Sequence, residues 1–113
     1  MPQEIVKSLI VTIVRRGWGD RVIEASMKAG AEGGTVVFGR GVGIHEQQKI
    51  MGICIEPEKE IVFTVVPRDR AESILQVIIS NINLNKPGQG IAFVIELSKV
   101  TGVVHALNDL PLK

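Results

Sequence analysis

Glycines recur at short intervals in two segments of the chain, and these segments are the best candidates for binding chemistry. The first contains Gly39, Gly41 and Gly43, and the second runs Gly88-Gln89-Gly90. Because glycine has no side chain, backbone N–H groups can approach an anion closely in such segments. Each segment could therefore be an anion nest, or a flexible loop entry in the first case and an ordinary turn after Pro87 in the second.

Side chains that could hold a metal or catalyse a reaction are sparse. His45, Glu46 and Cys54 are metal-ligand types in one stretch, but no Cys-x-x-Cys or His-x-x-x-His pair supports a site. Cys54 lies between two isoleucines without a neighbouring histidine, which favours a small hydrophobe over a nucleophile. No paired nucleophile and base is recognisable. We therefore expect no metal site and no catalytic residue.

Alternating strand and helix patterns surround the two glycine segments. Strands are predicted at 9–15, 35–38, 60–66 and 91–97, and helices at 20–29 and from 69 to the asparagine-rich stretch 81–85. The order is β-α-β, a long loop, then β-α-β. Two such units with right-handed crossovers predict an α+β fold, the ferredoxin-like β-α-β-β-α-β sandwich, with an antiparallel sheet and both helices on one face.

The two predicted helices carry recognisable end signals. Asp20 is expected to cap the first helix, with Val22, Ile23 and Met27 facing the core. Asp69 begins the second helix in a variant of the capping box. The buried stripe of this second helix follows the helical period and comprises Ala71, Ile74, Leu75, Ile78, Ile79 and Ile82.

The stretch from Gly41 to Glu58 shows neither a helical nor a strand period and is predicted to be a long loop. Loops of this length within a compact domain are uncommon and usually functional. We therefore expect this loop to carry function.

Length and composition limit the class of protein. The 113 residues fit a single domain, 1–113, and the apolar runs are too short for membrane insertion. Thirteen basic and twelve acidic residues are scattered along the chain, so we expect no nucleic-acid partner. A lone cysteine and an opening Met-Pro-Gln-Glu without a leader pattern favour a cytoplasmic location.

Three of the predicted strands, 9–15, 60–66 and 91–97, are apolar on both faces. Two helices can cover only one face of the sheet, so another copy of the chain is the simplest cover for the second. This pattern predicts a homo-oligomer.

Three segments in this order resemble the P-II family of signal-transduction proteins. They are Gly33-Gly34-Thr35-Val36 through Gly41-Val42-Gly43, Ile61 to Pro67, and Lys86-Pro87-Gly88-Gln89-Gly90 before a strand. The similarity extends from about Val6 to Val104, except within the long loop. The order and spacing on one β-α-β-β-α-β frame make the combination more specific than any single glycine pattern.

The resemblance implies a homotrimer with the sheets packed inward and a small-molecule effector, ADP, AMP or ATP, in clefts between subunits. The residues it places against the nucleotide are Thr35, Gly41, Val42, Gly43, Gly88, Gln89 and Gly90. It also implies that the long loop engages a partner transporter or metabolic enzyme of nitrogen or carbon assimilation. The residues of this partner-binding loop are Ile44, His45, Glu46, Gln47, Gln48, Lys49, Ile50 and Met51.

The chain departs from the family at the charged phosphate contacts. The family's lysine after the second turn corresponds to Ile91, and its two arginines correspond to Gly102 and Val104. We therefore expect a divergent P-II-like regulator in which AMP or ADP binds as well as ATP or better. A trimeric metal-responsive ferredoxin-like protein and a small enzyme that uses the same cleft are the alternatives.

Overall fold

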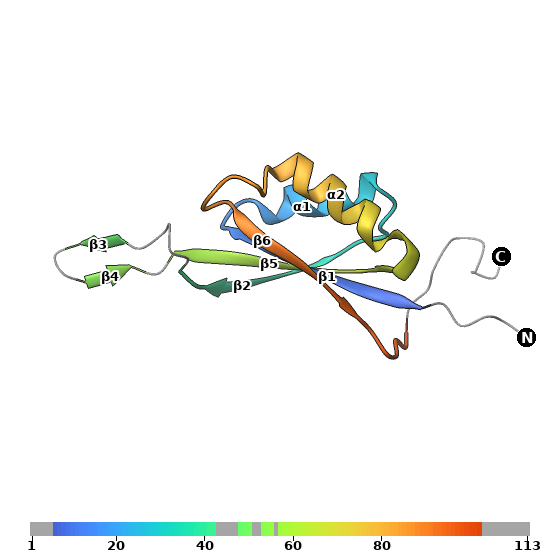
Figure 1. Cartoon of the computed structure of the whole chain (residues 1–113). Coiled ribbons are helices and arrows are strands. Elements are labelled where there is room, and N and C mark those ends of the chain that lie inside the picture. Colours follow the sequence, from blue (N-terminus) through green and yellow to red (C-terminus); the bar gives the residue numbers. More distant parts are fainter. Residues whose placement is uncertain (1–5, 43–47, 51–52, 56, 103–113) are drawn as a thin grey trace, which may run out of the picture.

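The computed structural model describes residues 6–42, 48–50, 53–55 and 57–102, with the backbone alone for 48–50 and 53–55. The helices and strands of this part, in chain order, are β1 (Lys7–Arg15), α1 (Gly19–Lys28), β2 (Thr35–Arg40), β3 (Gln48–Ile50), β4 (Ile53–Ile55), β5 (Glu58–Pro67), the 3-10 turn η1 (Arg68–Arg70), α2 (Ala71–Ile82) and β6 (Gly90–Glu96). Figure 1 shows α1 and α2 side by side over one face of a sheet.

The main sheet has four strands in the order β2-β5-β1-β6, and every neighbouring pair is antiparallel. Strand β5 lies between β1 and β2 although it follows both in the sequence, which is the split β-α-β arrangement. The structure therefore confirms the predicted ferredoxin-like α+β fold. The predicted strands are found, with ends that differ by one or two residues.

The core lies between the sheet and the two helices. Successive side chains of a strand point to opposite faces, so every second residue of β1 and β5 faces the helices. Ile10 and Val62 from these strands meet Ile74, Ile78 and Ile82 of α2, and all five are fully buried. The predicted apolar stripe of α2 is confirmed at these three isoleucines.

Helix α1 differs from the prediction at both its start and its buried face. It begins at Gly19, and the residue before it makes no capping hydrogen bond through its side chain, so Asp20 lies inside the first turn instead of capping it. Val22 is fully buried as predicted, whereas Met27 is 50% exposed and Ser26 is buried. Ser26 follows Val22 at the i+4 helical spacing and Met27 does not, which explains the difference.

The start of α2 also differs from the prediction. Residues 68–70 form the 3-10 turn η1, so Asp69 lies within that turn and the helix begins at Ala71. The expected capping box is therefore absent at this position. At the other end, Asn83 has a left-handed φ of 59°, which agrees with the helix stop predicted in the asparagine-rich stretch.

The segment predicted to be one long loop contains regular structure. Strands β3 and β4 pair as a short antiparallel hairpin, with Gln48 opposite Ile55, and they form a sheet separate from the main one. In Figure 1 this hairpin lies beyond the ends of β2 and β5. Glu58 already belongs to β5. Strands of three residues give too few alternations to be recognised from periodicity, which is why the sequence did not reveal them.

The face of the main sheet opposite the helices has no cover in the described part of the chain. Its side chains alternate with those of the core and are mostly apolar. The ones left most open are Ile91, Ile95, Val37, Phe93 and Val65, with exposures between 39% and 57%. The chain therefore presents an apolar sheet face, as its doubly apolar strands predicted.

The sequence also favours a short final strand or extended tail that includes Val103-Val104, and these two residues lie outside the described part of the chain. In the part of the chain that the structure describes, no helix is both long and apolar enough to cross a membrane.

Candidate functional site

Most of the candidate residues lie at the end of the main sheet from which the long loop leaves, whereas Thr35 lies at the other end of β2. Arg15 ends β1 directly opposite Lys59 of β5, and Val14 lies opposite Gly90 of β6. On the far side of β5, Gly39 of β2 lies opposite Lys59. Glycines from both edges of the sheet therefore lie at the same end as two basic residues from its centre.

The turn 88–90 needs its glycines for backbone reasons. Gly88 has a φ of 82° and Gly90 a φ of 151°, a region that residues with a Cβ rarely adopt. A Cβ on Gly90 would also clash with the carbonyl oxygen of Ile13 in β1. The backbone conformation of the turn is thus enough to explain why these positions are glycine, and contact with an anion would be an additional role.

Gln89 lies inside the protein and connects three elements. Its side chain is 5% exposed, and its Nε2 donates to the carbonyl oxygen of Ile82 at the end of α2 at 2.6 Å. Its Oε1 accepts a hydrogen bond of 2.9 Å from the Arg15 guanidinium. Its backbone N–H donates to the carbonyl oxygen of Lys86. The side-chain amide and the backbone N–H of Gln89 are therefore each engaged in a hydrogen bond within the protein.

The first glycine segment leaves the sheet at the opposite edge. The N–H of Gly41 donates to the carbonyl oxygen of Pro57 at 3.2 Å, which closes the base of the long loop. Val42 is 44% exposed, and Gly43 lies outside the described residues. The side-chain stem of Lys59 runs beside this segment, because a Cβ on Gly41 would lie 4.0 Å from its Cγ.

Sequence reasoning missed Lys59 as a neighbour of the glycines. This lysine is only 8% exposed although it carries a charge. In the sequence, a lysine beside an alternating strand looks like any other solvent-exposed polar residue. Only the pairing of β2 with β5 places it next to Gly39.

The two glycine segments of one chain are too far apart to hold one phosphate together. Strands β5 and β1 separate β2 from β6, and three strand spacings amount to about 14 Å. Thr35, at the start of β2, is exposed and lies about 20 Å along the chain from Gly41. Within one chain these residues therefore do not converge on one site.

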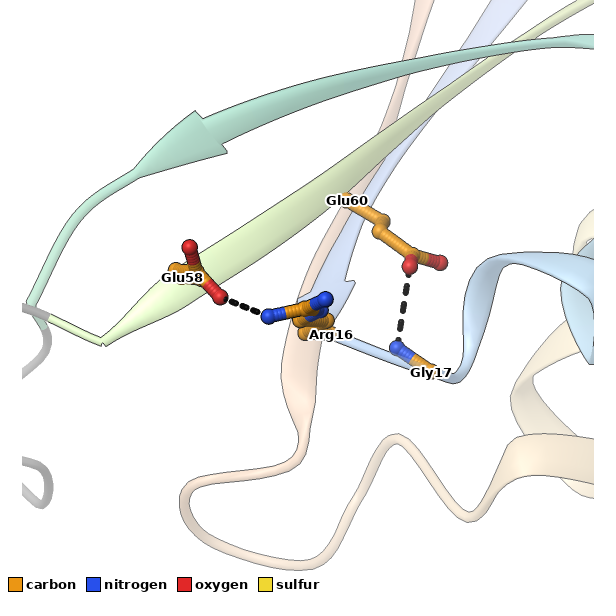
Figure 2. Close-up of polar contacts among 4 residues, drawn as sticks. All are labelled: Arg16, Gly17, Glu58 and Glu60. Atoms are coloured by element: carbon orange, nitrogen blue, oxygen red, sulfur yellow. Dashed lines mark hydrogen bonds and ion pairs between the residues drawn. The ribbon is translucent and has the colours of Figure 1, made fainter.

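The turn between β1 and α1 is fastened to β5 by two carboxylates (Figure 2). Glu60 accepts hydrogen bonds from the N–H of Gly17 at 3.0 Å and from the N–H of Gly19 at 2.7 Å. The second bond places a negative charge at the N-terminus of α1, where the helix dipole favours it. Arg16 forms an ion pair with Glu58, and both side chains are largely exposed.

Of the three positions that correspond to the family's charged phosphate contacts, the structure describes two, and neither carries a charge. Ile91 is 57% exposed in β6, so the corresponding position is an apolar surface. Gly102 is exposed with a φ of 92°, and Val104 lies outside the described residues.

Much of the predicted partner-binding loop is outside the described residues, namely Ile44, His45, Glu46, Gln47 and Met51. Gln48, Lys49 and Ile50 form β3, and the structure describes only their backbone. Within the described ranges, His, Cys, Asp and Glu side chains do not gather in any group of three that could hold a metal ion.

A ferredoxin-like sandwich with glycine turns at one end and an open apolar sheet face defines a class of small α+β domains. Comparison with known proteins refines the class. The model of the family "Nitrogen regulatory protein P-II" matches residues 7–105, so the chain belongs to the P-II family. It is a P-II-like regulatory signal-transduction protein, from a family whose members are regulators, form homotrimers and interact with partner proteins and small effectors.

Among solved structures, the chain is similar to PII from Arabidopsis thaliana, which was crystallised bound to citrate. The two share 27% sequence identity with a TM-score of 0.64, and the match covers 88% of this chain and 82% of the other. No curated protein sequence matches the chain.

Proposed function

We propose that this protein is a cytoplasmic homotrimeric regulator. It binds a small anionic effector between its subunits, and its long loop from Gly41 to Pro57 controls a partner enzyme or transporter of nitrogen or carbon metabolism. Its role is to bind and report, without catalysis of its own.

The separation of the two glycine segments is the observation that carries this proposal. Gly41 and the turn 88–90 leave the sheet at opposite edges, about 14 Å apart. In a ring of identical subunits, one edge of each subunit meets the other edge of its neighbour, because the contacts are heterologous. A ring therefore offers the one simple way for the two segments to form a joint site.

The open sheet face supports the ring. Side chains such as Phe93 and Ile95 would be covered when three sheets pack together. Family membership supports the number of three subunits.

The chemistry of the site favours an effector with little negative charge. Ile91 offers no positive charge, and the N–H groups of Gly41 and Gln89 are already engaged. Each charged hydrogen bond that is missing costs about 1.5–3 kcal/mol, or about tenfold or more in affinity. AMP or ADP should therefore bind as well as ATP or better. Citrate, which is bound in the related Arabidopsis structure, has three carboxylates and by the same argument should bind more weakly than AMP.

Isothermal titration of the purified protein with AMP, ADP, ATP with magnesium, and citrate tests the effector. We expect saturable binding of AMP or ADP with at most one site per chain. Tight ATP binding with a clear preference over AMP would contradict this part of the proposal.

Pull-down from a native lysate, with and without the bound effector, tests the regulatory role. We expect a specific enzyme or transporter whose retention changes with the effector and is lost when residues 44–55 are replaced by a short glycine linker. A rise in thermal stability with divalent metals alone would instead favour the metal-responsive alternative, and steady turnover of a nucleotide would favour the enzyme.

A further inference from the structure

Arg15 differs from Arg16 and Arg68, which both lie beside carboxylates. Arg16 is paired with Glu58, and Arg68 lies 3.7 Å from Glu96. Arg15 is exposed at the end of β1, and among the described residues no carboxylate lies within ion-pair distance of it. Within the part of the chain that the structure describes, its side-chain hydrogen bond goes to a neutral amide, so none of these residues cancels its charge.

The amide that holds Arg15 is itself fixed. Gln89 is 5% exposed and donates to the carbonyl oxygen of Ile82, which leaves its Oε1 pointing at the guanidinium at 2.9 Å. A guanidinium has five N–H donors in a rigid planar fork, and this bond uses only one of them. The remaining donors are held in place before any ligand arrives, which lowers the entropy lost on binding.

The neutrality of this anchor matters for function. A carboxylate at position 89 would hold the guanidinium as well but would offset its positive charge. An amide orients the arginine and leaves the charge available. The buried Gln89 side chain thus orients the exposed cation of Arg15 without neutralising it.

The position of Arg15 places that cation beside the turn 88–90, which is one of the two segments of the proposed effector site. The residue opposite Arg15 on one side is Lys59, whose stem runs beside Gly41. On its other side is the turn that ends at Gly90. Arg15 therefore lies on β1, the central strand that neighbours β6, at the end of the sheet that carries both glycine segments.

We propose that Arg15, oriented by Gln89, is a specificity-determining residue that binds one phosphate group of the effector through its planar fork. A bidentate contact of this kind suits one phosphate and does not neutralise three. The inference rests on the proposed function, because it assigns a residue to that site and gives a physical basis for the preference for AMP.

Two neighbouring arginines provide a matched pair of variants. Arg15→Gln removes the cation, and Arg16→Gln removes an adjacent cation that is already paired with Glu58. Both side chains are exposed, so both variants should fold, which circular dichroism and thermal melting will verify. The probes are AMP, ATP and inorganic phosphate, titrated calorimetrically.

We expect Arg15→Gln to weaken AMP binding about tenfold or more, while Arg16→Gln stays within about twofold of the wild type. Arg15→Lys keeps the charge without the fork and should recover only part of the affinity. Gln89→Met, which removes the anchor, should weaken AMP binding about threefold while Arg15 is still present.

The outcomes separate the inference from the proposed function. If the wild type binds AMP and Arg15→Gln binds it equally well, the inference is wrong and the proposed function stands. If the wild type binds inorganic phosphate through Arg15 but binds no nucleotide, the inference stands and the nucleotide part of the proposed function is wrong. If the wild type binds neither phosphate nor nucleotide, both are wrong.

Discussion

The two faces of the main sheet are similar in composition but differ in what covers them. On the face toward α1 and α2, Ile10, Val62 and Val66 are fully buried. On the opposite face, Phe93 is 40% exposed and Ile91 57% exposed. Both faces come from the same strands, because successive residues alternate between them.

This difference in cover indicates that one face stabilises the folded chain and the other takes part in assembly. The covered face has its partners within one chain, whereas the open face has no partner among the described residues. When another molecule covers apolar area of this kind, the free energy of association becomes more favourable by roughly 25 cal/mol per Å². We therefore expect substitutions on the covered face to affect folding of the chain, and substitutions on the open face to affect association.

The largest expected effect follows from placing a charge on the open face. Phe93→Glu would bury a carboxylate in the proposed interface, where an unpaired charge costs several kcal/mol. We expect the trimer to dissociate, which light scattering would detect as a fall in mass. Glu24→Lys on the exposed side of α1 is the control that should not change the mass. A Phe93→Glu protein with wild-type mass would show that the open face is not the interface.

Truncation of a side chain on the covered face should instead destabilise the folded chain. Ile78 of α2 is 0% exposed, so we expect Ile78→Ala to lower the free energy of unfolding by about 2–5 kcal/mol. Urea denaturation at a fixed protein concentration measures the loss. Ser80→Ala, on the exposed side of the same helix, should stay within about 0.5 kcal/mol. An equal loss for both variants would contradict the assignment of the core.

A smaller effect is expected where β5 holds the turn before α1. Glu60→Ala removes the acceptor of the N–H of Gly17 (Figure 2) and of the N–H of Gly19, and should cost about 1.5–3 kcal/mol. The matched change Glu58→Ala breaks only an exposed ion pair and should cost less than about 1 kcal/mol. Equal costs measured by urea denaturation would mean that the two hydrogen bonds contribute little.

The smallest expected effect is a gain in stability on the covered face. The hydroxyls of Ser8, Thr12 and Thr64 are buried without a hydrogen-bond partner in the described structure. Thr12→Val replaces one hydroxyl by a methyl group of similar size and should stabilise the protein by about 1 kcal/mol. A loss of stability in thermal melting would show that the Thr12 hydroxyl does have a partner, such as an internal water.

The sequence predicted the fold well because its signals were local. The apolar stripe of α2 and the alternating strands each appear within one segment, and their order gave the ferredoxin-like topology. Predictions that depended on the ends of elements failed at Asp20 and Asp69, because neighbouring residues can take the cap position at similar cost. The hairpin of β3 and β4 was missed because its strands are too short to show a period.

The candidate site was less accessible to sequence reasoning. The glycines were found because their types signal close backbone approach, but their separation at opposite sheet edges depends on strand order. The bond between Arg15 and Gln89 joins residues 74 positions apart, and the contact of Lys59 with the Gly41 segment needs the pairing of β2 with β5. Long-range contacts of this kind leave no local pattern.

Complementation between two defective subunits tests most directly the claim that the effector site is shared. Gly41→Asp and Gly88→Asp each place a negative charge in one glycine segment. A Cβ at position 41 would lie at an ordinary contact distance, 4.0 Å, from Cγ of Lys59. Among residues with a side chain, Asp is one of the few that occasionally adopt a left-handed φ such as the 82° of Gly88, and thermal melting of each variant checks that it still folds. Each variant alone should lose AMP binding. When the two are co-expressed and mixed at random, one interface of each mixed trimer carries two intact segments, so about a quarter of the sites should bind AMP again. Mixed trimers that bind no AMP would show that both segments act within one subunit and would contradict a site shared between subunits.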